Sequence, residues 1–260
     1  MYRVGLAVLW QSYKRMVGLP IISILDNGTK FILYPNSTNS TGNIYVKTYE
    51  AEYIYFLRKH IVKGGMIIDI GAHMGLFTLL LNNLFKGGYC FEPAKDTYMA
   101  LQNNLFLNRL MDEFIPINSA VSDNDGTHTL KMEGAFSGIN HLIETGEENS
   151  KDAEIVSTVS LDTFLIKNNI LSNINFLKID TEGHELTILM GSQQMLQNNP
   201  NLIILMENNC IEKVLELFAK VNFKVFAISS NGNVLSDNKS IANAYNIFAV
   251  GSLHPLYATL

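Results

Sequence analysis

The sequence predicts an α/β fold with a doubly wound, Rossmann-like and mostly parallel sheet. Three observations support this prediction. Short apolar runs of strand length alternate with longer segments whose apolar residues recur at helical spacing. The run Met66–Ile70 carries one charge and is bounded by glycines, as in strands that are covered on both faces. Several such runs end in an acidic residue, and open α/β sheets bind ligands at the carboxyl ends of their strands.

The predicted elements follow in order along the chain. The predicted helices are Met1–Val17, Thr48–Val62, Leu76–Leu84, Asp96–Leu107, one capped by Ser160, Glu185–Leu196 and Ile211–Lys220. The predicted strands of the sheet are Met66–Ile70, Tyr89–Phe91, Phe114–Val121, Ile174–Ile179, Leu202–Met206, Lys224–Ile228 and Tyr245–Val250. Gly126–Met132 and Glu154–Val159 are expected to form an extra hairpin. The polar segment Gly134–Asp152 between them is expected to be a mobile substrate-binding loop.

Chain length and composition favour one main domain. With 260 residues, of which 47% are hydrophobic, the chain can form one well-buried core with a small appendage. Asp26–Thr29 is a strong turn signal between Ile21–Leu25 and Lys30–Tyr34. We therefore expect a helix and hairpin cap over residues 1–47 and the α/β domain over residues 48–260.

Charge and cysteine usage exclude some function classes. A net charge of −5 gives no electrostatic footprint for a nucleic acid, so none is expected as a partner. Cys90 and Cys210 lack metal-ligand spacing and are expected to be reduced core thiols, which favours a cytoplasmic location. Lys14 and Arg15 interrupt the apolar start well short of the ~20 residues of a membrane span. No pattern in the sequence fixes the oligomeric state.

A glycine turn follows the first sheet strand. Gly71 and Gly75 bound the turn, and Glu92 ends the next strand about 20 residues later, where nucleotide folds place a ribose-binding acid. Pro93 then closes that strand by withholding an amide donor. A dinucleotide fingerprint needs the spacing G-x-G-x-x-G, which is missing here. A pyrophosphate ligand, and with it a nicotinamide-dependent oxidoreductase, is therefore not expected.

Asp69, the two glycines and Glu92 together resemble the first two motifs of class I S-adenosylmethionine-dependent methyltransferases. The resemblance narrows to the FkbM family and covers roughly Tyr49 to Glu207. The residues that carry it are Tyr49-Glu50, Ile68–Gly75, Phe91–Pro93, Ala120–Asp123, Ser160–Asp162, Leu177–Glu185 and Glu207. It implies a seven-stranded sheet closed by an antiparallel pair. His73 departs from the family, which usually has Asn there.

The resemblance also implies how S-adenosyl-L-methionine would be held. Asp69 would orient the amino acid part, the glycine turn would pass under the methionine part, and Glu92 would bind the ribose hydroxyls. The adenine would face Asn118, Ser119 and Ala120, with Asp123 as an alternative. The expected cofactor-binding residues are Asp69, Gly71, Ala72, His73, Gly75, Glu92, Pro93, Ser119, Ala120 and Asp180.

A second informative stretch runs from Asp180 to Glu185, directly after a predicted strand. Glu182 and His184 are the expected chemical pair, because a hydroxyl acceptor must lose a proton and imidazole titrates near neutrality. Asp180 is expected near the sulfonium end of the cofactor, and Glu207 adds a third carboxylate to the same rim. The alternative for His184 is a capping or packing role, and Glu185 is expected to serve the helix N-terminus. Three acids permit Mg²⁺ without requiring it, and no metal is expected.

Glu50 lies near the start of the helix before the first sheet strand. It either points into the site, where it would bind the substrate together with Glu182 and His184, or is a solvated first-turn acid. The expected reaction is O-methylation of a hydroxyl of a sugar, glycan or natural product. The alternatives are N-methylation of a peptide side-chain amide and a cofactor-binding protein without turnover. The acceptor itself is not encoded in any motif.

Overall fold

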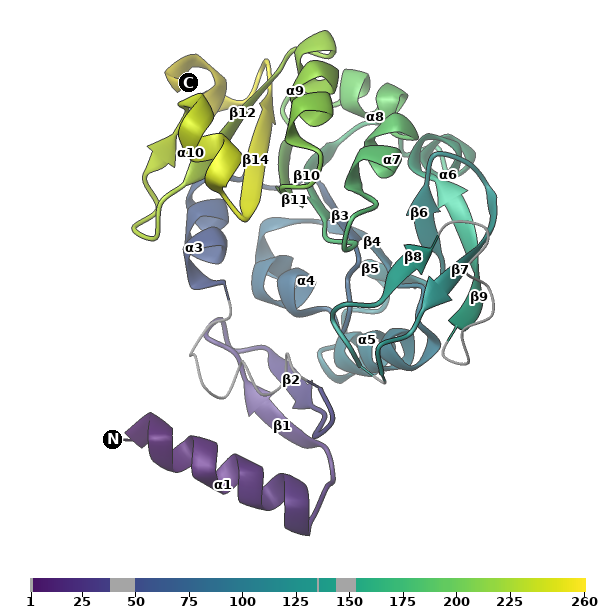
Figure 1. Ribbon diagram of the computed structural model, residues 1–260, viewed down its shortest axis with the longest axis vertical. Coiled ribbons are helices and arrows are strands. Elements are labelled where there is room, and N and C mark those ends of the chain that lie inside the picture. Colours follow the sequence, from purple (N-terminus) through teal and green to yellow (C-terminus); the bar gives the residue numbers. More distant parts are fainter. Residues whose placement is uncertain (1, 38–49, 135, 144–152) are drawn as a thin grey trace.

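A computed structural model describes residues 2–37, 50–134, 136–143 and 153–260. Its centre is a mixed sheet in the order β13-β12-β14-β11-β10-β3-β4-β5 (Figure 1). Five neighbouring strands, from β11 to β5, run parallel, and β14 and β12 form an antiparallel pair beside them. The strands are β3 (Met66–Ile70), β4 (Gly87–Phe91), β5 (Phe114–Ile117), β10 (Ile174–Ile179), β11 (Ile203–Glu207), β12 (Phe223–Ile228), β13 (Val234–Leu235) and β14 (Asn246–Gly251).

Helices cover both faces of this sheet, as a doubly wound fold requires. Along β3, Ile67 packs into one apolar cluster with the first group of helices, and Ile68 packs into a second cluster with the other group. The first group is α3 (Ala51–His60), α4 (Leu76–Leu81) and α5 (Lys95–Leu107). The second group is α6 (Leu161–Lys167), α7 (Glu185–Met190), α8 (Gln193–Asn198) and α9 (Ile211–Lys220). Shorter elements are η1 (Asn82–Leu84), α10 (Asn238–Asn243) and η2 (Pro255–Thr259).

The central sheet differs from the sequence prediction at three of its strands. Within the described residues it has eight strands rather than seven, because the two-residue β13 pairs with the outer edge of β12. The predicted strand Phe114–Val121 is two strands in different sheets. It breaks at Asn118, whose side-chain amide donates to the carbonyls of Glu92 and Pro93 at 2.9 Å each. β4 also begins at Gly87, two residues before the predicted strand Tyr89–Phe91.

A second sheet, in the order β6-β9-β7-β8, lies beside the first (Figure 1). Its strands are β6 (Ala120–Ser122), β7 (Gly126–Lys131), β8 (His141–Ile143) and β9 (Ala153–Ser160). The antiparallel pairing of β7 with β9 confirms the predicted extra hairpin. β8 lies inside the segment that was predicted as a loop, of which residues 135 and 144–152 fall outside the described residues.

Two further predictions need correction. The helix expected over Glu185–Leu196 is two helices, α7 and α8, which separate at Gly191. A Cβ on Gly191 would lie 2.4 Å from the Ser122 carbonyl oxygen, so the second sheet packs directly against this break. Cys210 is exposed rather than a core thiol, while Cys90 is buried as predicted. The Ser160 side chain caps α6, as predicted, by accepting from the Thr163 amide.

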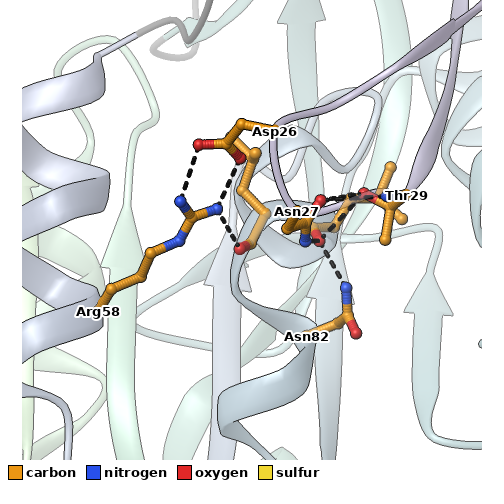
Figure 2. Close-up of polar contacts among 7 residues, drawn as sticks. Asp26, Asn27, Thr29, Arg58 and Asn82 are labelled. Atoms are coloured by element: carbon orange, nitrogen blue, oxygen red, sulfur yellow. Dashed lines mark hydrogen bonds and ion pairs between the residues drawn. The ribbon is translucent and has the colours of Figure 1, made fainter.

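The N-terminal helix α1 (Tyr2–Met16) and the hairpin of β1 (Ile21–Ile24) and β2 (Lys30–Leu33) form as predicted. Figure 2 shows how the hairpin turn is held on the body. The Arg58 guanidinium binds both Asp26 carboxylate oxygens at 2.8 Å, and Asn27 donates to the Leu79 carbonyl at 2.7 Å. No helix in the described residues is long and apolar enough to cross a membrane. The predicted boundary at residues 47 and 48 and Tyr49 lie outside the described residues.

Candidate active site

Two cavities adjoin at the carboxyl ends of the parallel strands. The first lies over β3, β4 and the second sheet, and the second lies over β10, β11 and β14. Asp180, Ser137 and Gly138 line both cavities. Asp180 therefore stands at the junction of the two cavities.

The glycine turn forms part of the first cavity, and its geometry explains the residue types. Gly71 has a φ of +70°, and a Cβ there would lie 1.8 Å from the Asp180 carbonyl oxygen. Gly75 has a φ of +84° and precedes α4, where a Cβ would lie 2.7 Å from Leu101 Cδ1. Gly71 therefore requires glycine for conformation and for space, whereas Gly75 requires it for conformation, because Leu101 Cδ1 is the end of a flexible side chain. The close approach of Gly71 to Asp180 brings the ends of β3 and β10 together.

Glu92 is the buried acid of the first cavity. Its side chain is 7% exposed and receives the His73 amide and the Ala94 amide, each at 2.9 Å and each on a different oxygen. Burial raises the pKa of Glu92 to about 7, and the two amide donors oppose that rise. A carboxylate has about four acceptor positions, so the ionised group can still accept hydroxyl donors from a ligand in the cavity.

The structure brings seven of the ten predicted cofactor-binding residues to the wall of the first cavity: Gly71, His73, Glu92, Pro93, Ser119, Ala120 and Asp180. Asp69, Ala72 and Gly75 do not line it. Asp69 is fully buried, and one of its oxygens accepts from the Thr78 hydroxyl at 2.7 Å. Its other oxygen has no partner among the described residues. Burial raises the pKa of Asp69, while the Lys178 ammonium opposes that rise.

The predicted adenine region is only partly assembled as expected. Ser119 and Ala120 line the first cavity, whereas Asn118 and Asp123 do not. The Ser119 hydroxyl donates to the Ser157 carbonyl at 2.9 Å. The apolar wall there is formed by Phe91, Val121, Leu130 and Leu142. This wall offers a planar ring a largely apolar contact.

Four carboxyl groups line the second cavity: Glu50, Asp180, Glu182 and Glu207. One oxygen from each of Asp180, Glu182 and Glu207 lies within 4.8 Å of the others, so these three residues could hold a divalent cation. Burial, then the charges of Glu207 and Asp180, raises the pKa of Glu182 to about 7. Burial is also the largest cause that raises the pKa of Glu50 to about 7. Like charges at this spacing keep part of the cluster protonated at neutral pH.

Lys178 and Tyr245 are cavity residues that the sequence reasoning missed. Lys178 is buried in β10, and its ammonium lies 2.7 Å from an Asp180 carboxylate oxygen. The Tyr245 hydroxyl donates to Glu207 at 2.9 Å. Lys178 is the only charge within the strand run Ile174–Ile179 and stands two residues before Asp180. That spacing puts both side chains on the same face of an extended chain, which was the available signal.

His184 and Glu182 do not lie together, although they were predicted as a pair. Glu182 lines the second cavity, and His184 lines the first. His184 Nε2 lies 3.0 Å from the Ser122 hydroxyl oxygen. Burial, followed by the nearby His128, lowers the pKa of His184, so its imidazole is neutral at pH 7. His184 precedes α7 but makes no side-chain capping bond.

Glu185 has a structural role other than the predicted interaction with the helix dipole. Its side chain is fully buried, and one oxygen accepts from the Thr181 amide, the Thr181 hydroxyl and the Gly183 amide. The other oxygen accepts from the Asn209 side chain at 2.9 Å. These bonds fix the loop that carries Glu182, which itself has a φ of +56°. Glu185 therefore holds in place the loop whose residue Glu182 lines the second cavity.

Comparison with known proteins gives one family match. The model described as the methyltransferase FkbM domain matches residues 69–225. Hexuronic acid methyltransferase AglP of Haloferax volcanii is 24% identical over 149 residues, which are 57% of this chain and 59% of that protein. Methyltransferase 1 of Beauveria bassiana is 26% identical over 147 residues, covering 48% of this chain and 57% of that protein. The matched region is thus under two thirds of either relative.

Among solved structures, a methyltransferase FkbM from Methylobacillus flagellatus has a TM-score of 0.49 and 11% sequence identity. The match covers 78% of this chain and 48% of that one. A putative rRNA methylase from Clostridium thermocellum has a TM-score of 0.47 and 13% identity, with 78% of this chain and 94% of that one covered.

Proposed function

Because the chain belongs to the methyltransferase FkbM domain family, we propose that it transfers the methyl group of S-adenosyl-L-methionine to a hydroxyl of a sugar, glycan or natural product. The observation that carries the proposal is the junction at Asp180 between two cavities of different chemistry. One has a buried carboxyl group beside an apolar wall, and the other is lined by carboxyl groups. A cofactor and an acceptor in these two cavities would meet beside Asp180.

The first cavity fits the cofactor. Glu92 would accept the two ribose hydroxyls, since its carboxylate already faces the cavity with acceptor positions to spare. Gly71 leaves the floor of the cavity without a side chain, and Asp180 offers a negative charge near the junction. When bound, the cofactor supplies an electrophilic methyl group on a sulfonium ion. Asp69 would act only from beneath the turn, because it does not reach the cavity wall.

Glu182 is the proposed general base in the second cavity. A hydroxyl is a poor nucleophile until its proton has an acceptor, and a base works best when its pKa lies near the working pH. The pKa of Glu182, raised to about 7 by burial and neighbouring carboxylates, meets this condition. A Glu182 oxygen would receive the hydroxyl proton while the hydroxyl oxygen forms a bond to the methyl carbon, whose bond to sulfur breaks so that S-adenosylhomocysteine leaves.

The other residues of the second cavity would orient the acceptor. Tyr245 holds the Glu207 carboxylate, and Lys178 holds that of Asp180, so both acids have fixed directions. His184 lies on the cofactor side, so we propose that it contacts the cofactor rather than removing the acceptor proton. This assignment separates the roles of His184 and Glu182.

The charge of the second cavity favours a neutral, polyhydroxylated acceptor. Its wall carries four carboxyl groups and one ammonium group. Hydroxyl groups donate well to carboxylates, whereas an acidic acceptor would be repelled unless a cation lay between them. A neutral sugar unit therefore fits this wall better than a sugar acid.

An acceptor screen tests the proposal. The protein and cofactor carrying a labelled methyl group would be incubated separately with neutral glycans, uronic acid glycans, peptides and ribosomal RNA. We expect base-stable label on neutral glycans, lost in Glu182→Gln and kept in Glu216→Gln, an exposed acid on α9. Labelling of peptide amide nitrogen or of RNA, with neutral glycans unlabelled, would contradict the proposed acceptor class.

A further inference from the structure

The N-terminal part of the chain exposes large apolar side chains that line neither of the two cavities. In Figure 1, α1 lies at one end of the molecule, with the β1-β2 hairpin between it and the central sheet. Val8, Leu9 and Met16 on α1 are 62%, 67% and 79% exposed, and Ile22 and Ile24 on β1 are 57% and 62% exposed. We call these five residues the N-terminal apolar surface. Monomeric proteins rarely leave such a group of aliphatic side chains uncovered.

The packing of α1 fixes which of its sides faces outward. Trp10 is 3% exposed, and its ring stacks on Tyr13 with centroids 5.9 Å apart. Leu9 and Met16 lie seven residues apart, two helical turns along one exposed stripe of α1. On β1, Ile22 and Ile24 alternate with the less exposed Ile21 and Ser23, so both point to the same side of the hairpin.

Helix and hairpin also enclose a groove that joins their exposed residues. Leu9, Tyr13 and Met16 line it from α1, and Ile21 and Ile22 line it from β1. Three of the five exposed residues, Leu9, Met16 and Ile22, therefore border the same groove. A ligand that covers this surface must offer apolar contact over both elements.

The charge of this part of the chain is opposite to that of the rest. Residues 1–25 contain the basic residues Arg3, Lys14 and Arg15 and no acidic residue, whereas the remaining residues contain 16 basic and 24 acidic side chains. Arg15 lies seven residues after Val8, on the edge of the exposed stripe of α1. A basic segment with an apolar outer face is typical of helices that lie in the surface of an anionic bilayer.

We propose that the N-terminal apolar surface docks the protein on an anionic lipid bilayer. The aliphatic side chains enter the boundary between headgroups and acyl chains, and the basic residues contact lipid phosphates. A second copy of the chain fits less well, since a two-fold interface would place the two basic segments against each other. The acidic body is repelled by the same lipids, so only this end of the molecule faces the bilayer.

Co-sedimentation of the full-length protein with lipid vesicles tests the proposal. The vesicles would contain either phosphatidylcholine alone or phosphatidylcholine and phosphatidylglycerol in equal amounts. We expect binding to the anionic vesicles, weakened by salt. Leu9→Gln should weaken it about fivefold through lost apolar burial. Arg15→Glu should weaken it about tenfold, because the local charge changes by two units.

Two control variants carry the same chemical changes at distant exposed positions. Leu253→Gln alters a leucine that is 66% exposed, against 67% for Leu9, and Lys220→Glu reverses a charge at the end of α9. Both should bind vesicles as the unaltered protein does, and thermal melting would show that all four variants fold. Equal binding by Leu9→Gln and Leu253→Gln would overturn the proposal. The proposal would also be overturned if the unaltered protein did not bind vesicles and was instead a dimer that Leu9→Gln converts to a monomer.

Discussion

Replacing Glu182 by Gln should abolish most of the turnover and leave cofactor binding intact. The substitution keeps the size of the side chain but removes its capacity to take a proton. A positioned general base typically contributes 10²–10⁴-fold to a rate, so we expect kcat to fall by about 10²-fold or more. Glu182 lines only the second cavity, so the affinity for S-adenosylhomocysteine should change by less than about twofold.

The pH profile carries the sharper form of this prediction. With the pKa of Glu182 raised to about 7, the active, ionised form is lost as pH falls through 7. The rate should therefore drop about tenfold per pH unit below 7 and reach a plateau above it. Glu207→Gln removes the neighbouring charge that raises this pKa most after burial, so the inflection should move to lower pH.

The assay is the release of S-adenosylhomocysteine with the hydroxyl acceptor found in the screen, over about pH 5 to 9. Glu216→Gln on α9 serves as the matched control and should keep both rate and profile. A Glu182→Gln rate within about threefold of the unaltered protein, with the same inflection, would refute the assignment of the base. A profile that instead shifts in His184→Gln would give the proton to His184.

Three further predictions concern stability, ionisation and metal. Gly71→Ala should lower the free energy of unfolding by more than about 3 kcal/mol, since the new Cβ clashes with a carbonyl oxygen. Gly232 has a similar φ of +76° but open space around it, so Gly232→Ala should lower the free energy of unfolding by only about 1 kcal/mol in denaturant unfolding. The pKa of Glu92 is raised to about 7 from 4.5, so its ionisation lowers stability between those pH values and remains unfavourable above 7. The stability of Glu92→Gln relative to the unaltered protein should therefore rise by up to ~3 kcal/mol as pH rises from about 4 to 8. The same pH dependence in the melting curves of both proteins would contradict this prediction. A chelator should leave turnover unchanged, because Glu182 accepts the proton without an ion; lost turnover with retained cofactor binding would instead place a cation among the three carboxylates.

The parts of the fold that were predictable are those where local pattern and tertiary packing agree. Met66–Ile70 and Ile174–Ile179 are strands with the predicted bounds, because each is an apolar run that ends at a turn or a charge. The split of Phe114–Val121 depends on the hydrogen bonds from Asn118 to the carbonyls of Glu92 and Pro93. The sequence around Asn118 contains no pattern that predicts this contact. The break at Gly191 depends likewise on packing against the second sheet.

The candidate site shows the same division. The carboxyl ends of neighbouring parallel strands meet at one edge, so the approach of Asp180, Glu182 and Glu207 followed from topology. Topology did not predict which cavity each of these side chains lines. Glu182 has a positive φ, and this turn sends it and His184 in different directions. Asp69 was placed in the correct strand, but its burial beneath the turn depends on how α4 packs.

Isothermal titration with S-adenosylhomocysteine tests the central claim most directly, because it needs no acceptor. The unaltered protein should bind with micromolar affinity. Glu92→Gln should bind at least about tenfold more weakly, since hydrogen bonds to a charged group contribute about 1.5–3 kcal/mol, and Glu216→Gln should bind normally. No binding by the unaltered protein, or equal binding by Glu92→Gln, would contradict the assignment of the first cavity to the cofactor.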